Sequence, residues 1–319
     1  MTSQILDLAV QVMLPLTLLV AAGGLWPVIF PHTQVAELRT QLNRLVMYLF
    51  YPCILFAVAA TTPIDASLLS VPLLVGIGSL AGGFFIYALL YWTPLGRGVP
   101  DATRAILVVG GMFGNTFNIG VPVLQFFFGP DALRYAVYND VLMTMPLVWS
   151  LGVWLCLHLG KGVQRATYGS VLKVTLSMPP LWAFAFGFAF QQSGLTFPPL
   201  ISAASMIGQA TIPVVLFVLG LTVPWRNLVP RREILGTAMI KLLLAPAIVW
   251  GAAHLLYHPP EQAQFAAVVE ATTPAMMSGL MLADRFKLDH EAAALLIGWS
   301  TILFWLSLPL LMALGLLTG

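Results

Sequence analysis

Residues Gly110 to Pro122 read Gly-Gly-Met-Phe-Gly-Asn-Thr-Phe-Asn-Ile-Gly-Val-Pro, and they interrupt a strongly apolar run from about Ile106 to Phe128. Glycine and proline weaken the hydrogen-bond ladder of a helix. In lipid the released backbone groups need partners, so such a break survives only where it faces protein or a watery cavity. The stretch therefore predicts a broken transmembrane helix whose interruption is a binding site.

The composition of the whole chain is that of an integral membrane protein. Of its 319 residues 59% are hydrophobic and 8% charged, against about 25% charged in soluble proteins. Since roughly 20 apolar residues span a bilayer, we expect an all-α protein with ten spans, over about 6–29, 43–61, 68–92, 103–128, 133–158, 169–190, 199–223, 234–257, 262–283 and 292–316. Lipids surround such a chain, and we expect no nucleic-acid partner, although the net charge of +2 says little about partners.

The basic residues orient these spans. With ten spans, one set of alternate loops carries Arg39, Arg44, Arg97, Arg104, Lys161, Arg165, Lys173, Arg226, Arg231, Arg232, Arg285 and Lys287, and the other carries Arg134 alone. Cytoplasmic loops are enriched in Lys and Arg. We therefore expect a multi-pass protein of the plasma membrane (the inner membrane in a bacterium) with both termini on the non-cytoplasmic side.

The two halves of the chain resemble each other. Tyr51–Pro63 matches Ile212–Pro224, with prolines and a phenylalanine in register, and Gly129-Pro-Asp131 has its counterpart in Lys287-Leu-Asp289. Each repeat, 1–160 and 161–319, then holds five spans, and an odd number predicts inverted insertion. The partner of the first break is Glu270-Ala-Thr-Thr-Pro-Ala-Met-Met-Ser278 in the ninth span.

Three motifs resemble the auxin efflux carrier family, which includes the plant PIN-FORMED carriers and bacterial carboxylate permeases. They are Leu42–Phe56, Asn115–Pro122 and Pro274–Phe286. The resemblance implies a 5+5 inverted repeat in which the broken helices 4 and 9 cross, helices 1–2 and 6–7 form a scaffold, and helices 3–5 and 8–10 form a transport unit. It also implies a homodimer through the scaffold and an organic anion such as malonate, malate or an auxin. Phe117 and Ser278 depart from the family pattern, so no particular substrate is carried over.

The expected substrate site combines the two breaks with the second span. Its candidate residues are Tyr51, Pro52, Asn115, Thr116, Asn118, Gly120, Pro122, Thr272, Thr273, Pro274 and Ser278. The carboxamides offer donors and acceptors to a carboxylate, or else they cap the freed helix ends. The hydroxyls bind substrate, or else they return hydrogen bonds to backbone carbonyls. Two helix N-termini converge at the breaks and favour an anion.

Three ionisable residues are predicted to lie roughly 12 Å deep, about eight or nine residues into their spans. Asp140 and Glu270 are candidates for proton or sodium coupling, because charge at this depth is costly and usually functional. Lys241 could serve an anionic substrate or extend toward the surface. The alternative for either carboxylate is a static pairing with Lys241 or a backbone donor.

Transport of a small organic anion by alternating access is the first functional hypothesis. A sodium- or proton-coupled cation exchanger or symporter of related fold is the alternative. An intramembrane enzyme is disfavoured, since all five histidines lie near span ends and Asp140 is the only deep aspartate. No cofactor or metal site is predicted beyond a coupling Na⁺ or H⁺.

Overall fold

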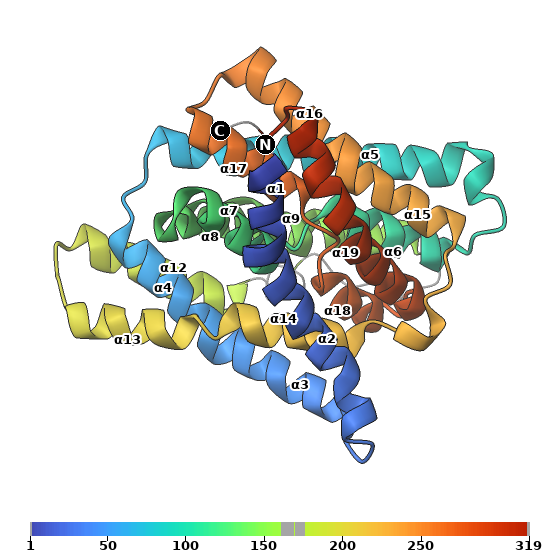
Figure 1. Ribbon diagram of the computed structural model, residues 1–319, viewed down its shortest axis with the longest axis horizontal. Coiled ribbons are helices and arrows are strands. Elements are labelled where there is room, and N and C mark those ends of the chain that lie inside the picture. Colours follow the sequence, from blue (N-terminus) through green and yellow to red (C-terminus); the bar gives the residue numbers. More distant parts are fainter. Residues whose placement is uncertain (1, 161–168, 170–175, 318–319) are drawn as a thin grey trace.

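A computed structural model describes residues 2–160, 169 and 176–317, and the regular structure within these ranges is helical (Figure 1). Among the described helices, seven are long and apolar enough to cross a membrane: Gln4–Ile29, Val35–Thr61, Ala66–Trp92, Pro130–Leu159, Pro198–Thr222, Arg232–Leu256 and His290–Ala313. The prediction of a helical, multi-pass membrane protein is confirmed at this level.

Most of the long spans consist of shorter α-helices joined without a break by π-helical turns. In the first part of the chain the elements are α1 (Thr2–Leu8), α2 (Leu14–Ile29), α3 (Val35–Leu45), α4 (Tyr51–Thr61), α5 (Ala66–Trp92), α6 (Asp101–Met112), η4 (Thr116–Gly120), α7 (Val121–Phe128), α8 (Leu133–Asn139), η6 (Asp140–Thr144), α9 (Met145–Leu147), η7 (Val148–Gly152) and α10 (Val153–Leu159). In the second part they are α12 (Pro179–Gln192), α13 (Pro198–Gly208), α14 (Thr211–Thr222), α15 (Arg232–Met239), η9 (Ile240–Leu244), α16 (Ala245–Ala252), α17 (Glu261–Thr272), α18 (Ser278–Arg285) and α19 (His290–Ala313).

Both expected breaks are present, and local chemistry explains where each helix ends. Helix α6 stops at Met112, and Phe113 is already extended. Helix α17 stops at Thr272, and Thr273 is extended (φ −58°, ψ 145°). A residue that precedes proline is pushed out of the helical region, so Pro274 ends α17.

The two breaks cross and pair with each other. The Asn115 backbone N–H donates to the Pro274 carbonyl (2.7 Å), and the Met276 N–H donates to the Phe113 carbonyl (3.2 Å). The Ala275 N–H donates to Ser300 Oγ (3.0 Å). These bonds satisfy backbone groups that neither helix can satisfy internally, which is what an interruption in the membrane interior requires.

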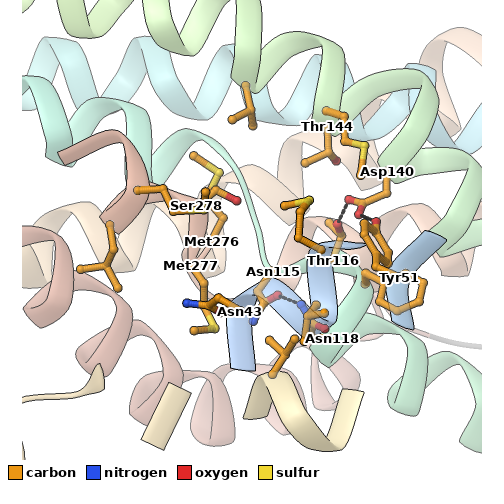
Figure 2. A pocket seen from close by; sticks show the side chains of 18 of the residues that line it. Asn43, Tyr51, Asn115, Thr116, Asn118, Asp140, Thr144, Met276, Met277 and Ser278 are labelled. Atoms are coloured by element: carbon orange, nitrogen blue, oxygen red, sulfur yellow. Dashed lines mark hydrogen bonds between the residues drawn. The ribbon is translucent and has the colours of Figure 1, made fainter. Parts of the chain in front are cut away.

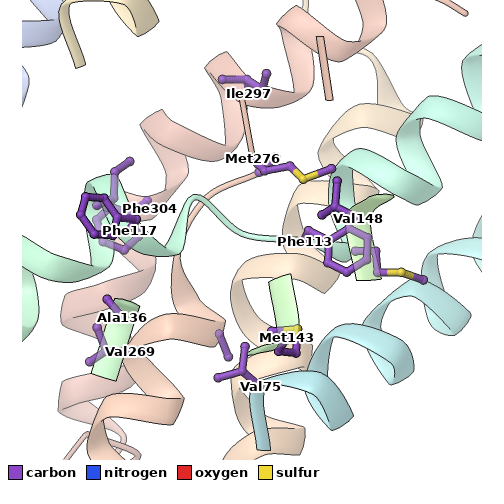
Figure 3. Close-up of a cluster of buried hydrophobic side chains, with 14 of the residues drawn as sticks. Val75, Phe113, Phe117, Ala136, Met143, Val148, Val269, Met276, Ile297 and Phe304 are labelled. Atoms are coloured by element: carbon purple, nitrogen blue, oxygen red, sulfur yellow. The ribbon is translucent and has the colours of Figure 1, made fainter. Parts of the chain in front are cut away.

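The helices pack as two groups. Helix α4 packs on α12 and α13, and α14 packs on α2 and α3, whereas α5 packs on α6, α16 and α17, and α19 packs on α6 and α15 (Figure 1). The buried cluster in Figure 3 includes Phe113 and Phe117 from the first break and Met276 from the second. The crossing therefore lies inside the protein rather than against lipid.

The count of ten spans and the inverted repeat stay predictions. The sixth expected span, about 169–190, coincides in the described residues with α12, which begins at Pro179. Residues 161–168 and 170–175, including Lys161, Arg165 and Lys173, lie outside the described ranges. The orientation of the termini and the homodimer likewise stay predictions.

Candidate functional site

A cavity of about 280 Å³ lies at the crossing of the two breaks. Its walls come from α3, α4, the segment Gly114–Asn118, the η6–η7 region of the long span Pro130–Leu159, α14 and α18. Asn43, Thr40 and Asp284 line its open end and are exposed. The cavity thus reaches from the middle of the protein to the face where α3 begins and α18 ends.

The first break supplies polar side chains to this cavity. Asn115, Thr116 and Asn118 line it, and Asn118 Nδ2 donates to Asn115 Oδ1 (2.7 Å; Figure 2). Asn118 Oδ1 is buried without a hydrogen-bond partner. The carboxamides therefore contact each other and keep hydrogen-bonding capacity for a ligand, rather than closing a helix end, since neither residue caps its helix through the side chain.

The second break faces the first across the cavity. Met276, Met277 and Ser278 line it opposite the carboxamides (Figure 2). Helix α18 begins at Ser278 and η4 begins at Thr116. The first-turn N–H groups of a helix lack intrahelical partners, so two helix N-termini border one polar space.

Asp140 belongs to the cavity wall and is held by two hydroxyls. The Tyr51 hydroxyl donates to Asp140 Oδ2, and Thr116 Oγ1 donates to Oδ1 (2.8 Å; Figure 2). Asp140 also opens the π-helical turn η6, and such turns occur frequently at functional sites. The carboxylate therefore connects α4, the first break and the long span Pro130–Leu159.

Glu270 lies behind the first break and does not line the cavity. It is fully buried, its Oε2 accepts from Asn139 Nδ2 (3.1 Å), and its Oε1 has no hydrogen-bond partner. Gly120 lies against it, because a Cβ at that position would be 2.6 Å from Oε1. Gly120 thus permits the close approach of Glu270 to η4, and it does not line the cavity.

Lys241 is buried and turned toward the end of α17. Its Nζ donates to the Ala271 carbonyl (2.6 Å), and the side chain is 3% exposed. A cation at a helix C-terminus complements the partial negative charge there. Lys241 neither reaches the surface nor lines the cavity; it stabilises the interrupted helix.

The remaining candidates support the breaks. Thr272 Oγ1 donates to the Val268 carbonyl and Thr273 Oγ1 to the Glu270 carbonyl (both 2.7 Å), so these hydroxyls return their hydrogen bonds to the backbone. Pro274 contributes its carbonyl to the crossing. Pro52 and Pro122 each lie in the first turn of a helix, α4 and α7, and do not line the cavity.

Several lining residues were not anticipated from the sequence. Asn43, Thr144 and Trp149 line the cavity, and Asn139 holds Glu270. Asn139 stands beside Asp140 in an apolar run, so the pair of polar residues is a signal that sequence inspection could use. Thr144 and Trp149 carry no such signal, because a lone threonine or tryptophan is ordinary in a membrane span.

Comparison with known proteins identifies the family. The family model described as "Membrane transport protein", that of the auxin efflux carriers, matches residues 8–312. The chain belongs to this family. It is therefore a membrane transporter and not an enzyme.

Two archaeal proteins are similar to the transporter over most of their length. An uncharacterized transporter of Methanothermobacter thermautotrophicus is 28% identical over 280 residues, covering 86% of this chain and 88% of the relative. An uncharacterized transporter of Methanocaldococcus jannaschii is 24% identical over 272 residues, covering 79% and 82%. Their descriptions give no substrate, so the substrate has to be argued from the cavity.

Proposed function

We propose that the transporter carries a small organic carboxylate, of malonate, malate or auxin-like chemistry, by alternating access. The observation that carries the proposal is the cavity at the paired breaks, since interrupted helices that meet in mid-membrane are the usual substrate site of inverted-repeat carriers. A volume of about 280 Å³ suits a small organic acid, because drug-sized ligands occupy pockets of roughly 300–1,000 Å³.

The donors around the cavity support an anionic substrate. The N-termini of η4 and α18 border it, and each carries partial positive charge. Asn115 and Ser278 add side-chain donors. Asp140 is the buried charge in the wall, and two hydroxyls already satisfy it; a carboxylate would therefore bind on the side of Asn115 and Ser278.

Two further features support alternating access. A second hollow, of about 1120 Å³, lies between α4 and α13 on one side and the Gln125–Arg134 region on the other. It lies near the end of α4, at Thr61, and the start of the long span Pro130–Leu159, whereas the cavity lies near Tyr51 at the start of α4 and near Asp140 to Trp149 farther along that span. Between the two, the Tyr138 hydroxyl donates to the Thr62 carbonyl (2.9 Å) and its ring meets Phe184 at 5.2 Å. The contact of Tyr138 with the end of α4 and with α12 would close the substrate path on the side of the second hollow. The cavity is meanwhile open toward the opposite side of the membrane.

The packing of the helices supports a division into a scaffold and a transport unit. Helices α1–α4 and α12–α14 would form the scaffold, and α5–α10 with α15–α19 the moving unit. The cavity, the second hollow and the Tyr138 contact all lie where these groups meet. By the distribution of basic residues, the open cavity faces the cytoplasm.

Uptake into liposomes tests the substrate. Purified protein is assayed with labelled malonate, malate and indole-acetate, with and without sodium and proton gradients. Asn118→Ala should abolish most uptake of the true substrate, whereas Gln262→Ala, which removes an exposed carboxamide at the start of α17, should leave it unchanged. Unaltered uptake by Asn118→Ala would show that the substrate binds elsewhere.

A cation-coupled exchanger or symporter is the second candidate, and the position of Asp140 favours it, because a carboxylate in the wall is a natural cation ligand. In the same assay an exchanger would move sodium or protons without any organic acid. A coupled anion carrier would need both the coupling ion and the organic acid for transport. Asp140→Asn or Glu270→Gln would remove the dependence of uptake on that ion. If neither variant changes it, these carboxylates do not couple transport.

A further inference from the structure

We propose that the groove between α2, α14 and α19 binds one anionic phospholipid, with an acyl chain along α2 and the phosphate beside Arg226. The groove has a volume of about 890 Å³ and is lined mainly by apolar side chains. Its described lining has no residue in common with that of the cavity at the breaks, although Thr222, which lies between Leu221 and Val223 of the groove, lines that cavity. Nothing in the transport proposal depends on it.

The length of the groove matches one leaflet. Along α2 its wall extends from Thr17 to Val28, which at 1.5 Å per residue is about 16 Å. Half of the hydrocarbon core of a bilayer is about 15 Å. Leu25 and Val28 on its rim are 53% and 60% exposed, so the groove is accessible to a chain that enters from the membrane.

The charge at one end of the groove selects the headgroup. Arg226 follows the end of α14 and is the single charged residue in the described lining, which contains no acid. Trp225 lies beside it, 43% exposed, and donates its indole N–H to the Gly220 carbonyl (2.8 Å). Tryptophan is typical of the membrane interface, and an arginine there attracts anionic lipid. A phosphate without a compensating ammonium group is the complementary partner.

A second copy of the chain fits this groove less well than a lipid. A two-fold interface brings the same surface of both subunits together, so Arg226 would approach a lining that offers no carboxylate. The groove also lies at the boundary between the two helix groups, since α2 and α14 belong to one group and α19 to the other. A bound lipid would therefore contact both.

Native mass spectrometry and thermal denaturation of the detergent-purified full chain test the proposal, with phosphatidylglycerol and phosphatidylcholine as probes. We expect one phosphatidylglycerol to be retained preferentially and to raise the Tm. Arg226→Gln should weaken this binding about five-fold, whereas Arg44→Gln, which removes an exposed arginine outside the groove, should not. Ala21→Leu narrows the groove and should reduce retention of both lipids.

Three results would overturn the proposal. The first is equal binding of the two lipids by the unaltered protein. The second is phosphatidylglycerol retention that neither Arg226→Gln nor Ala21→Leu reduces. The third is a disulfide between copies carrying Leu25→Cys, formed in the membrane, which would make this face a subunit interface. None of these results bears on uptake of organic acids.

Discussion

Gly114 is the position at which the crossing tolerates no side chain. A Cβ there would lie 2.2 Å from Thr273 Oγ1 and 3.1 Å from Lys241 Nζ, whereas ordinary contact begins at 3.4 Å. In Gly114→Ala the breaks must separate by about 1 Å, which lengthens the bond from Asn115 N–H to the Pro274 carbonyl beyond hydrogen-bonding distance. Overpacking costs about 1–3 kcal/mol and each lost hydrogen bond about 1 kcal/mol.

We therefore expect Gly114→Ala to destabilise the protein by about 3 kcal/mol and to lower its Tm by roughly 6–12 °C. Thermal denaturation in detergent, followed by tryptophan fluorescence, measures this. The matched control is Gly251→Ala in α16, where a Cβ would meet nothing within 4 Å; its Tm should stay the same or rise slightly, because alanine favours a helix over glycine.

Removing the Thr273 hydroxyl should relieve the clash of a side chain at position 114. Thr273→Ala removes the atom that the new Cβ meets. The free energy of unfolding of the double variant should therefore fall by at least ~1 kcal/mol less than the sum of the losses of the two single variants. Equal Tm values for Gly114→Ala and Gly251→Ala would refute the close crossing. Strict additivity with Thr273→Ala would show that the clash is not with that hydroxyl.

Three further variants probe the supports of the crossing and the cap of helix α5 through the same Tm measurement. Lys241→Met leaves the Ala271 carbonyl without its donor and should cost about 2 kcal/mol; no loss would contradict the capping role. Ser300→Ala leaves the buried Ala275 N–H unpaired and should cost about 1–3 kcal/mol, more than Ser307→Ala, whose hydroxyl only returns a bond to its own helix. Asp65 caps α5, and hydrogen bonds from Ser67 and the Leu68 N–H hold its pKa below the usual range; Asp65→Ala should cost about 1 kcal/mol at neutral pH. Because this stabilisation is lost as pH falls through the folded pKa, the deficit should shrink in acid, and a deficit constant down to pH 3 would contradict it.

The sequence predicted the two interruptions because their composition conflicts with their surroundings. Glycine, asparagine and proline within an apolar run have few explanations in lipid, and the internal match indicated where the second interruption would lie. The crossing itself, through Asn115 and Pro274, required the structure, because no local pattern says which carbonyl accepts a released N–H. The same holds for the antiparallel contact of Gly114 with Ala275.

The individual roles of the polar residues were harder to predict. Thr272, Thr273 and Ser278 look equivalent as hydroxyls in one segment, yet only Ser278 lines the cavity. The difference arises because the two threonines lie on the last turn of α17 and at its end, where the carbonyls three and four residues earlier accept their hydroxyls. Ser278 begins a new helix and has no preceding turn to bond.

The arrangement of Asn139 and Asp140 connects the cavity to the buried glutamate. These consecutive residues face opposite sides of the first break: Asp140 accepts from Thr116 in the cavity wall, while Asn139 donates to Glu270 behind it. The segment η4 lies between them, with Thr116 at its start against one carboxylate and Gly120 at its end against the other. A substrate that displaced η4 would alter the surroundings of both acids at once. Coupling through this segment would require no direct contact between substrate and Glu270, so Glu270→Gln should change ion dependence while leaving the substrate preference unchanged.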